Sequence, residues 1–229
     1  MSVRVRRALP SDATAIAAIA EKTFGEPFDR HRIGGLLKAG RGYSLVALDA
    51  RGIMAFADNF ITVSRTGGQR LELDLLAVEP QAQGTGIGRR LIAECQLLAR
   101  ELDVPLLRAL VRRENLVMRR LCASCGFAIS EQSYGLHVTS PGPGANGCLD
   151  NDGTHLVPVE TFAYSGIWIE GSLTREGILR ALSVAATRQL QRVGTLVAQG
   201  DRVPVKLLAD SGFQLLGTYD WWTLKLKTV

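Results

Sequence analysis

The chain has 229 residues, 46% of them hydrophobic and 21% charged, which is typical of a folded protein with one large domain or two small ones. Its longest apolar stretches fall short of the roughly 20 residues that cross a bilayer, so the sequence predicts no membrane partner and we expect a cytoplasmic location. A net charge of +5 suits either nucleic acid or a polyanionic small molecule, and 6% aromatic residues are too few for a base-stacking platform, which disfavours nucleic acid as the partner.

Periodicity along the first half of the chain predicts alternating strands and helices. Alternating residues favour strands over 3–8, 43–48, 53–63 and 71–78, and the turn-rich residues 49–52 indicate that the second and third of these form a hairpin. Apolar residues at helical spacing indicate one helix capped by Ser11 or Asp12 and another over 30–38. A strand over 106–111, a helix over 116–124 and a strand pair over 127–138 complete this half.

A glycine-rich loop separates the strand over 71–78 from the helix that follows. Its sequence is Gln83-Gly84-Thr85-Gly86-Ile87-Gly88. Such a loop binds anions, because free amides and the positive end of the helix dipole converge on one point. A P-loop would need lysine and a hydroxyl residue after the last glycine, where Arg89 and Arg90 stand, and a dinucleotide fingerprint would need glycine at 89. Both of these nucleotide motifs are therefore excluded.

The loop resembles the Q/R-x-x-G-x-G/A signature of the GNAT superfamily of N-acetyltransferases, and Val78-Glu79-Pro80 often accompanies that signature. The segment from Asn115 to Leu121, followed by Gly126-Phe127, resembles the second cofactor-contacting segment of the same family. With the flanking elements, the likeness covers residues 1 to 138. It implies an α/β (α+β) GNAT fold, in which helices flank a mixed central sheet and one parallel strand pair splays apart.

The resemblance also implies which residues hold the cofactor, acetyl-CoA. The loop amides would bind the CoA pyrophosphate, Arg89 would contact a further phosphate, and the pantetheine arm would pair with the backbone of the preceding strand, beside Asn115. The implied cofactor-binding residues are Leu76, Ala77, Val78, Gln83, Gly84, Thr85, Gly86, Ile87, Gly88, Arg89 and Asn115.

Two carboxylates in the strand over 71–78 are candidates for the chemistry. Strict alternation places Glu72, Asp74 and Leu76 on one face. A protonated amine, with a pKa of about 10.4 like that of lysine, must lose a proton before its nitrogen attacks a thioester. Glu72 is the first candidate for the base because it resembles a glutamate of several family members, and Asp74 is the second, as a base or as a group that binds a cationic acceptor.

The alternative role for both carboxylates is solvent exposure or pairing with an arginine. The family analogy also assigns the Leu76 N–H to the oxyanion of the tetrahedral intermediate, which needs a preorganised donor.

Cys122 stands where many family members carry the tyrosine that protonates the leaving thiolate. Either Cys122 or another residue, such as Tyr134 or Tyr43, supplies that proton, or the thiolate takes it from water. Cys122 and Cys125 form a CxxC pair, but no histidine spacing completes a metal site, and the pair lies at an expected helix C-terminus, where the dipole disfavours a thiolate. We therefore expect packing cysteines and no bound metal.

Residues 139–156 are rich in Pro, Gly, Asn and Asp, which predicts a linker between a GNAT domain over 1–138 and a smaller α/β unit over 157–229. In this unit we expect a strand over 160–170, a helix over 175–192, a strand over 195–199, a helix over 203–209 and a strand pair over 214–227. Because this order, with Gly212-Phe213, repeats the order that leads to Gly126-Phe127, we interpret the unit as a degenerate half-GNAT repeat.

The loop over 170–177 lacks the glycine signature, which predicts that the second unit binds no CoA. Trp221 or Trp222 is a candidate wall of the acceptor site, or else a core residue. The duplication predicts a monomer with an internal pseudo-dimer, and a homodimer is the alternative.

Two functions remain open on the sequence. The chain is either an acyltransferase that moves the acetyl group of acetyl-CoA to a primary amine of a small molecule, peptide or protein by direct attack on the thioester, or a non-catalytic acyl-CoA-binding sensor or regulatory module. The missing tyrosine and the degenerate second half motivate the second hypothesis.

Overall fold

The computed structural model describes residues 3–40, 43–142 and 153–226. Within these ranges ten strands form one mixed sheet, flanked by six α-helices and by 3-10 helices at Pro10–Asp12 and Pro80–Ala82. The strands are β1 (Arg4–Arg7), β2 (Leu45–Asp49), β3 (Gly52–Val63), β4 (Gln69–Val78), β5 (Leu106–Arg112), β6 (Ala128–Thr139), β7 (His155–Glu160), β8 (Ser165–Glu170), β9 (Arg192–Ala198) and β10 (Gln214–Lys225). The helices are α1 (Ala13–Phe24), α2 (Arg30–Lys38), α3 (Ile87–Glu101), α4 (Leu116–Ser124), α5 (Arg175–Thr187) and α6 (Arg202–Asp210). None of these helices is long and apolar enough to span a membrane.

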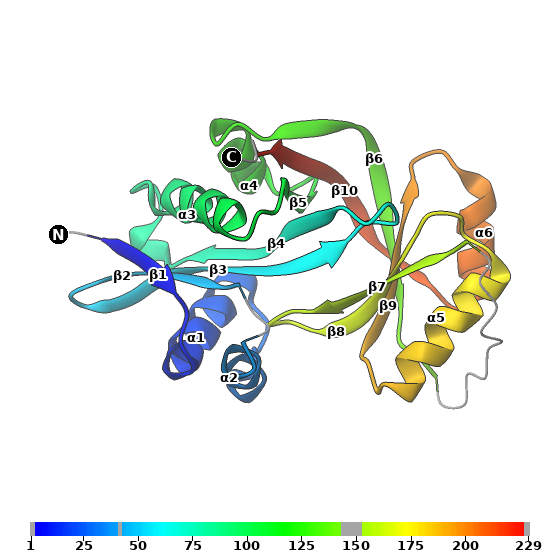
Figure 1. Cartoon of the computed structure of the whole chain (residues 1–229), viewed down its shortest axis with the longest axis horizontal. Helices are drawn as coiled ribbons and strands as arrows, with labels where there is room; N and C mark the ends of the chain where they lie inside the picture. Colours follow the sequence, from blue (N-terminus) through cyan, green and yellow to red (C-terminus); the bar gives the residue numbers. More distant parts are fainter. Residues whose placement is uncertain (1–2, 41–42, 143–152, 227–229) are drawn as a thin grey trace.

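The order of the strands across the sheet is β1-β2-β3-β4-β5-β10-β6-β9-β8-β7 (Figure 1). β4 and β5 run parallel, as do β8 and β9, and the other neighbours are antiparallel. The last strand of each half lies in the part of the sheet that the other half builds, because β10 pairs with β5 and β6 pairs with β9. The two halves of the chain therefore share one sheet.

β4 and β5 pair only where they begin. Three residue pairs form their parallel ladder, from Leu71 with Leu107 to Leu73 with Ala109, and the strands diverge beyond it. The splayed parallel pair that the sequence predicts is present. Its open end lies between the C-terminal ends of β4 and β5.

A β-bulge interrupts β4 just before the splay. β3 pairs Asn59 with Leu73 and Asp58 with Leu75, so Asp74 has no partner across this ladder. The extra residue shifts the alternation of side chains by one position. Even-numbered residues of β4 therefore point to one face of the sheet before the bulge and to the other face after it.

Packing on the two faces of the sheet shows this reversal. Leu73 before the bulge and Leu76 after it both contact the core under α3, whereas Leu75 and Ala77 contact the core under α1. The expectation that Leu76 shares a face with Glu72 is therefore wrong. Strict alternation fails here because the register is set by β3, which the residues of β4 alone do not reveal.

Helices cover both faces of the first half (Figure 1). α3 covers one face of the sheet, which we call the α3 face, and α1 and α2 cover the opposite face, which we call the α1 face. The predicted apolar stripe of α3 is buried, with Leu91 and Cys95 at 0% exposure. α5 packs against Ile167 and Val193 of β8 and β9. These residues belong to a third core, and the registers of β6 with β9 and with β10 place that core on the α3 face too.

The two predicted strand pairs over 127–138 and 214–227 are wrong, because β6 and β10 are single strands of 12 residues that pair with each other. Each of these segments contains a glycine, Gly135 or Gly217. Gly217 allows a close approach, since an added Cβ would lie 2.9 Å from the guanidinium of Arg112.

The segment predicted as one strand over 160–170 is the β7–β8 hairpin. Its turn contains neither glycine nor proline, and the Thr161 hydroxyl oxygen accepts the N–H groups of Ala163 and Tyr164 to form it. The predicted helix over 175–192 ends at Thr187, so that Arg192 begins β9. Of the expected linker, residues 143–152 lie outside the described residues.

Candidate functional site

The loop before α3 presents main-chain amides without partners. Gly84 and Gly86 have φ angles of 75° and 88°, a left-handed conformation that glycine adopts without strain. Gly86 is the N-cap of α3, and no side chain caps it. Among the described residues no acceptor bonds to the amides from Gly84 to Arg89, because the first turn of a helix lacks intrahelical partners. These amides and the helix dipole form an anion site.

The end of β4 presents an open main-chain edge beside this loop. Glu79 N–H donates to Met54 O of β3 at 2.8 Å, so the polar groups of Glu79 and Ala77 face β3. Because successive strand residues point their N–H and C=O groups to opposite sides, those of Leu76 and Val78 face the splay. The Val78 carbonyl accepts a hydrogen bond from the Gln83 side chain at 3.0 Å.

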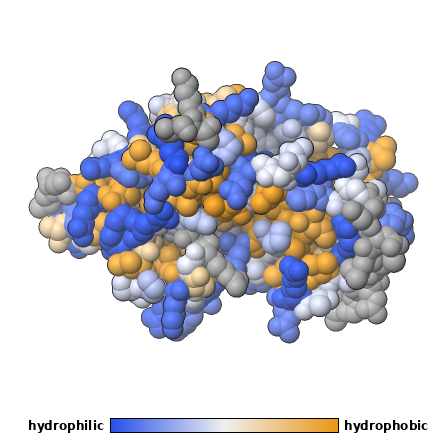
Figure 2. Space-filling view, in the orientation of Figure 1, coloured by the Kyte–Doolittle hydropathy of each residue, from blue (hydrophilic) through white to orange (hydrophobic). Residues whose placement is uncertain are grey.

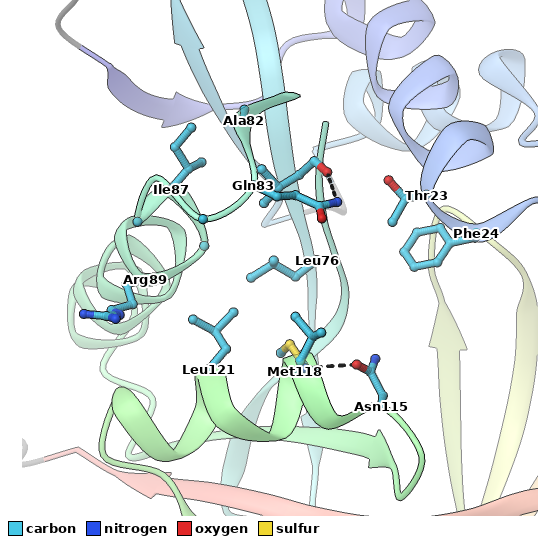
Figure 3. A pocket seen from close by; sticks show the side chains of 15 residues that line it. Thr23, Phe24, Leu76, Ala82, Gln83, Ile87, Arg89, Asn115, Met118 and Leu121 are labelled. Carbon is cyan, nitrogen blue, oxygen red and sulfur yellow. Dashed lines mark hydrogen bonds between the residues drawn. The ribbon is translucent and has the colours of Figure 1, made fainter. Parts of the chain in front are cut away.

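A cavity of about 550 Å³ joins the loop to this open edge. Figure 3 shows the loop and α3 on one side of it, Leu76 in the middle, and Thr23 and Phe24 of α1 on the other side. Asn115, the N-cap of α4, accepts the Met118 N–H at 3.0 Å and lines the base. The predicted residues that line the cavity are Leu76, Val78, Gln83, Gly84, Gly86, Ile87, Gly88, Arg89 and Asn115.

Two residues predicted to bind the cofactor lie elsewhere. Ala77 is fully buried in the core under α1, and its main chain pairs with Phe56. The Thr85 hydroxyl donates to Ala82 O at 2.6 Å, and Thr85 borders a neighbouring depression. The lining residues that the sequence analysis missed are Thr23, Phe24 and Ala82, and Val117, Met118 and Leu121 come from the segment that it assigned to cofactor contact as a whole. The contribution of α1 could not be found from the sequence, because only the fold brings Thr23 and Phe24 to the cavity.

Glu72 lies in a buried ion-pair network and is 3% exposed. Its carboxylate accepts the Thr62 hydroxyl, and its Oε2 accepts Arg108 Nε at 2.7 Å. Arg108 Nη2 and Arg70 Nη2 also bond to Glu170, from the second half of the chain, at 3.2 Å and 2.9 Å. Thr62 and Arg108 thus occupy both oxygens of the Glu72 carboxylate. The structure therefore disfavours Glu72 as the base.

Asp74 occupies the bulge, and its environment is different. Its Oδ2 atom is buried and has no hydrogen-bond partner in the described part of the chain. Burial and, to a smaller extent, the Asp58 carboxylate raise the pKa of this carboxyl to about 7, and the Thr161 hydroxyl opposes the rise. A carboxyl with a pKa near neutrality can take a proton at physiological pH.

The candidates for a general acid do not reach the cavity. Cys122 is fully buried in the core under α3, and burial raises the pKa of its thiol to about 12. Tyr43 packs at the edge of the same core, and Tyr134 borders a different cavity. Tyrosine, cysteine and carboxylate side chains are absent from the described residues that line the cofactor cavity.

The corresponding helix start in the second half is closed. Thr174 is the N-cap of α5, and its hydroxyl oxygen accepts the Gly177 N–H at 2.9 Å. The Thr174 side chain thus already binds a main-chain N–H group that an anion would need at this helix start. This agrees with the absence of the glycine signature from residues 170–177.

Comparison with known proteins identifies the first half. Residues 14–127 match the model of the acetyltransferase (GNAT) family. No curated protein matches the sequence.

Solved structures share the fold, some over nearly the whole chain and one over 59% of it. A putative acetyltransferase from Pyrococcus horikoshii is 13% identical, with a TM-score of 0.63 over 98% of this chain and 90% of its own. A GCN5-related N-acetyltransferase from Sphaerobacter thermophilus is 15% identical, with a TM-score of 0.61 over 99% and 97%. A putative acetyltransferase from Salmonella typhimurium, solved with acetyl-CoA, is 21% identical, with a TM-score of 0.52 over 59% and 84%. At these identities the likeness concerns the fold.

Proposed function

Because the chain belongs to the acetyltransferase (GNAT) family, whose cofactor is acetyl-CoA, we propose that it is an N-acetyltransferase that acetylates a primary amine of a small molecule or peptide. One observation carries the proposal. An open anion site and an open strand edge meet in one cavity, and a carboxyl with a pKa near 7 lies at the adjacent bulge of β4. Membership of the family supports acetyl transfer, and a carboxyl that can accept a proton near neutral pH supports an amine as the acceptor.

The residues present fit acetyl-CoA. The amides from Gly84 to Arg89 would hold the pyrophosphate, and the Leu76 and Val78 edge would pair with the amides of the pantetheine arm. Gly88 gives room at the helix start, since an added Cβ would lie 3.1 Å from Leu121 Cδ2. When bound, the cofactor supplies an acetyl thioester.

We propose Asp74, the second candidate of the sequence analysis, as the base in place of Glu72. Asp74 would accept the proton of the incoming ammonium group, which the paired Glu72 cannot do without breaking its bond to Arg108. Leu76 lies two residues along β4, and its N–H faces the splay, where it would stabilise the oxyanion. The proton for the leaving thiolate would come from water at the cavity mouth, because Cys122 is buried.

The strand order supports the proposal that residues 157–229 are a degenerate half-GNAT repeat and that the chain is an internal pseudo-dimer. On the two sides of the central β10–β6 pair, the order of elements is the same: β5 and β4 on one side, β9 and β8 on the other. Each side has one parallel pair. Exchange of the last strands is what two associating GNAT units would give.

The experiment that tests the function measures thermal stability with acetyl-CoA and thiol release with a panel of primary amines. We expect an increase in melting temperature with acetyl-CoA and release of CoA thiol in the presence of at least one amine. Stabilisation without thiol release for any amine or peptide would support the sensor hypothesis instead. Absence of both would contradict the proposal.

A further inference from the structure

A second cavity, of about 290 Å³, lies at the centre of the sheet. β4 and β5 contribute Arg70 and Arg108, and the other walls come from β6, β8, β9 and β10. Its aromatic walls are Tyr134, Trp168 and Trp221. The cavity thus lies where the two halves of the chain meet.

This central cavity opens on the α1 face, opposite the loop that would hold the cofactor. Ala109 of β5 packs into the core under α3, so its neighbour Arg108 lies on the other face, beside Glu72. Trp221 pairs with Leu110, which shares the face of Arg108, whereas Trp222 is in the core under α3. An acceptor body held on this face would lie on the side of the sheet opposite the cofactor loop.

The charges of the cavity compensate one another. Arg70 and Arg108 are 8% and 9% exposed, and both bond to Glu170, while Arg108 also bonds to Glu72. The Arg108 guanidinium lies 3.8 Å from the centre of the Trp221 ring, which it covers. Two buried cations are therefore matched by two carboxylates, and a charged group that entered the cavity would have to displace one of them.

The remaining walls are aromatic and apolar. Trp168 and Trp221 meet edge to face with ring centres 6.2 Å apart, and Trp168 Nε1 donates to Tyr164 Oη at 3.0 Å. Leu136 and Leu196 are half-buried and belong to none of the three cores. Figure 2 shows hydrophobic side chains at the surface in the middle of the molecule. A surface of this kind, inside a cavity, binds an apolar or aromatic body.

Size restricts the ligand further. The volume lies at the lower end of the roughly 300–1,000 Å³ of cavities that hold drug-sized ligands. A small molecule or one side chain fits such a space, and a folded surface does not.

We propose that the central cavity binds the body of the amine acceptor, and that this body is compact, uncharged and aromatic or apolar, as in an arylalkylamine. The inference rests on the proposed function and names its substrate class. It also gives the C-terminal half a role, because Trp168 and Leu196 come from that half, whose own helix start is closed by Thr174.

The test compares kcat/KM for 2-phenylethylamine and tryptamine with that for ethanolamine, spermidine and glucosamine, at saturating acetyl-CoA. We expect a preference of at least about tenfold for the two arylalkylamines. A preference for the polyamine or the amino sugar would overturn the proposal.

Two variants assign the effect to the cavity. Leu196→Arg places a charge inside it, and Leu216→Arg makes the same change at a leucine of β10 that is 48% exposed and outside it. We expect the first to lower kcat/KM for 2-phenylethylamine by about tenfold or more and the second to leave it unchanged, with equal stabilisation by acetyl-CoA in both. Equal activity of the two variants would contradict the assignment.

A direct binding measurement keeps this inference separate from the proposed function. Titration of 2-phenylethylamine should change the intrinsic tryptophan fluorescence. Trp168→Phe should lower the affinity for 2-phenylethylamine that this titration measures, and this variant should fold even if Leu196→Arg does not. Binding without thiol release would overturn the transferase proposal but not the cavity. Thiol release from other amines, with no binding of arylalkylamines, would overturn the cavity proposal alone, and absence of both signals would overturn both.

Discussion

Phe162 of the C-terminal half donates its main-chain N–H to Asp58 Oδ2 of β3 at 2.8 Å. Ser44 donates to the other carboxylate oxygen, and the Phe162 ring packs in the core under α1. Asp58 lies directly beside the bulge that holds Asp74. The tip of the β7–β8 hairpin is thereby fixed next to the proposed base, and the second half helps to set its environment.

The pH dependence of activity should report on Asp74. Because a base must be unprotonated, we expect kcat to rise with pH through about 7, the pKa to which burial raises this carboxyl. Asp58→Asn removes a negative charge that raises the Asp74 pKa, so this limb should move to lower pH. Steady-state kinetics from pH 5 to 9 checks both statements, and a limb that stays in place would exclude Asp74 as the titrating group.

Gly86→Ala should weaken binding of acetyl-CoA. Alanine at a left-handed φ costs roughly 1–2 kcal/mol, and the strain lies in the loop that would hold the pyrophosphate. Gly67→Ala is the matched control, because Gly67 has a φ of 86°, has equally open space around it and lies in the β3–β4 turn. Calorimetry should show reduced affinity for the Gly86 variant only. Similar affinities in the two variants would contradict the loop assignment.

Glu72→Gln should act mainly on stability. Removing one partner of a buried ion pair typically costs about 3–5 kcal/mol, because the other charge is left buried, and here that charge is Arg108. Glu114→Gln breaks an ion pair with Arg112 in which Glu114 is 72% exposed, and it should change the free energy of unfolding by less than about 1 kcal/mol. Urea unfolding of both variants makes the comparison. Equal stabilities would show that the network around Glu72 contributes little.

The exchange of strands predicts that neither half folds alone. Trp222 and Leu226 of the second half are 6% and 9% exposed in the core under α3, so a fragment of residues 1–142 would expose that core. We expect this fragment to be insoluble by itself and to co-purify with residues 153–229 when the two are expressed together. Cooperative unfolding of the first fragment on its own would contradict this interpretation.

Local signals in the sequence were sufficient for the cofactor loop. Gly84 and Gly86 are needed at left-handed positions, and Leu91 and Cys95 repeat at the helical period, so the loop and the helix after it follow from neighbouring residues. The mixed sheet with a splayed pair followed from resemblance to a family, and the structure confirms it.

Features set by distant partners could not be predicted. The bulge at Asp74 arises from pairing with β3, and the arginine that pairs with Glu72, an alternative role that the sequence left open, is Arg108, 36 residues away. Both effects separate the two carboxylates, which look equivalent when only the strand is considered. The long β10 was missed for a similar reason. Glycine is needed at 217 because the Arg112 side chain of a neighbouring strand packs closely against it, and the residues of β10 alone do not reveal this contact.

The claim that Asp74 and not Glu72 is the base is tested most directly by comparing two variants, Asp74→Asn and Glu72→Gln. Thiol release from acetyl-CoA is measured for both at pH 8 with the best amine. We predict that Asp74→Asn lowers kcat/KM by about 10²–10⁴-fold while acetyl-CoA still stabilises it, and that folded Glu72→Gln keeps most of its activity. Full activity in the Asp74 variant, with loss of activity in the Glu72 variant, would contradict the account.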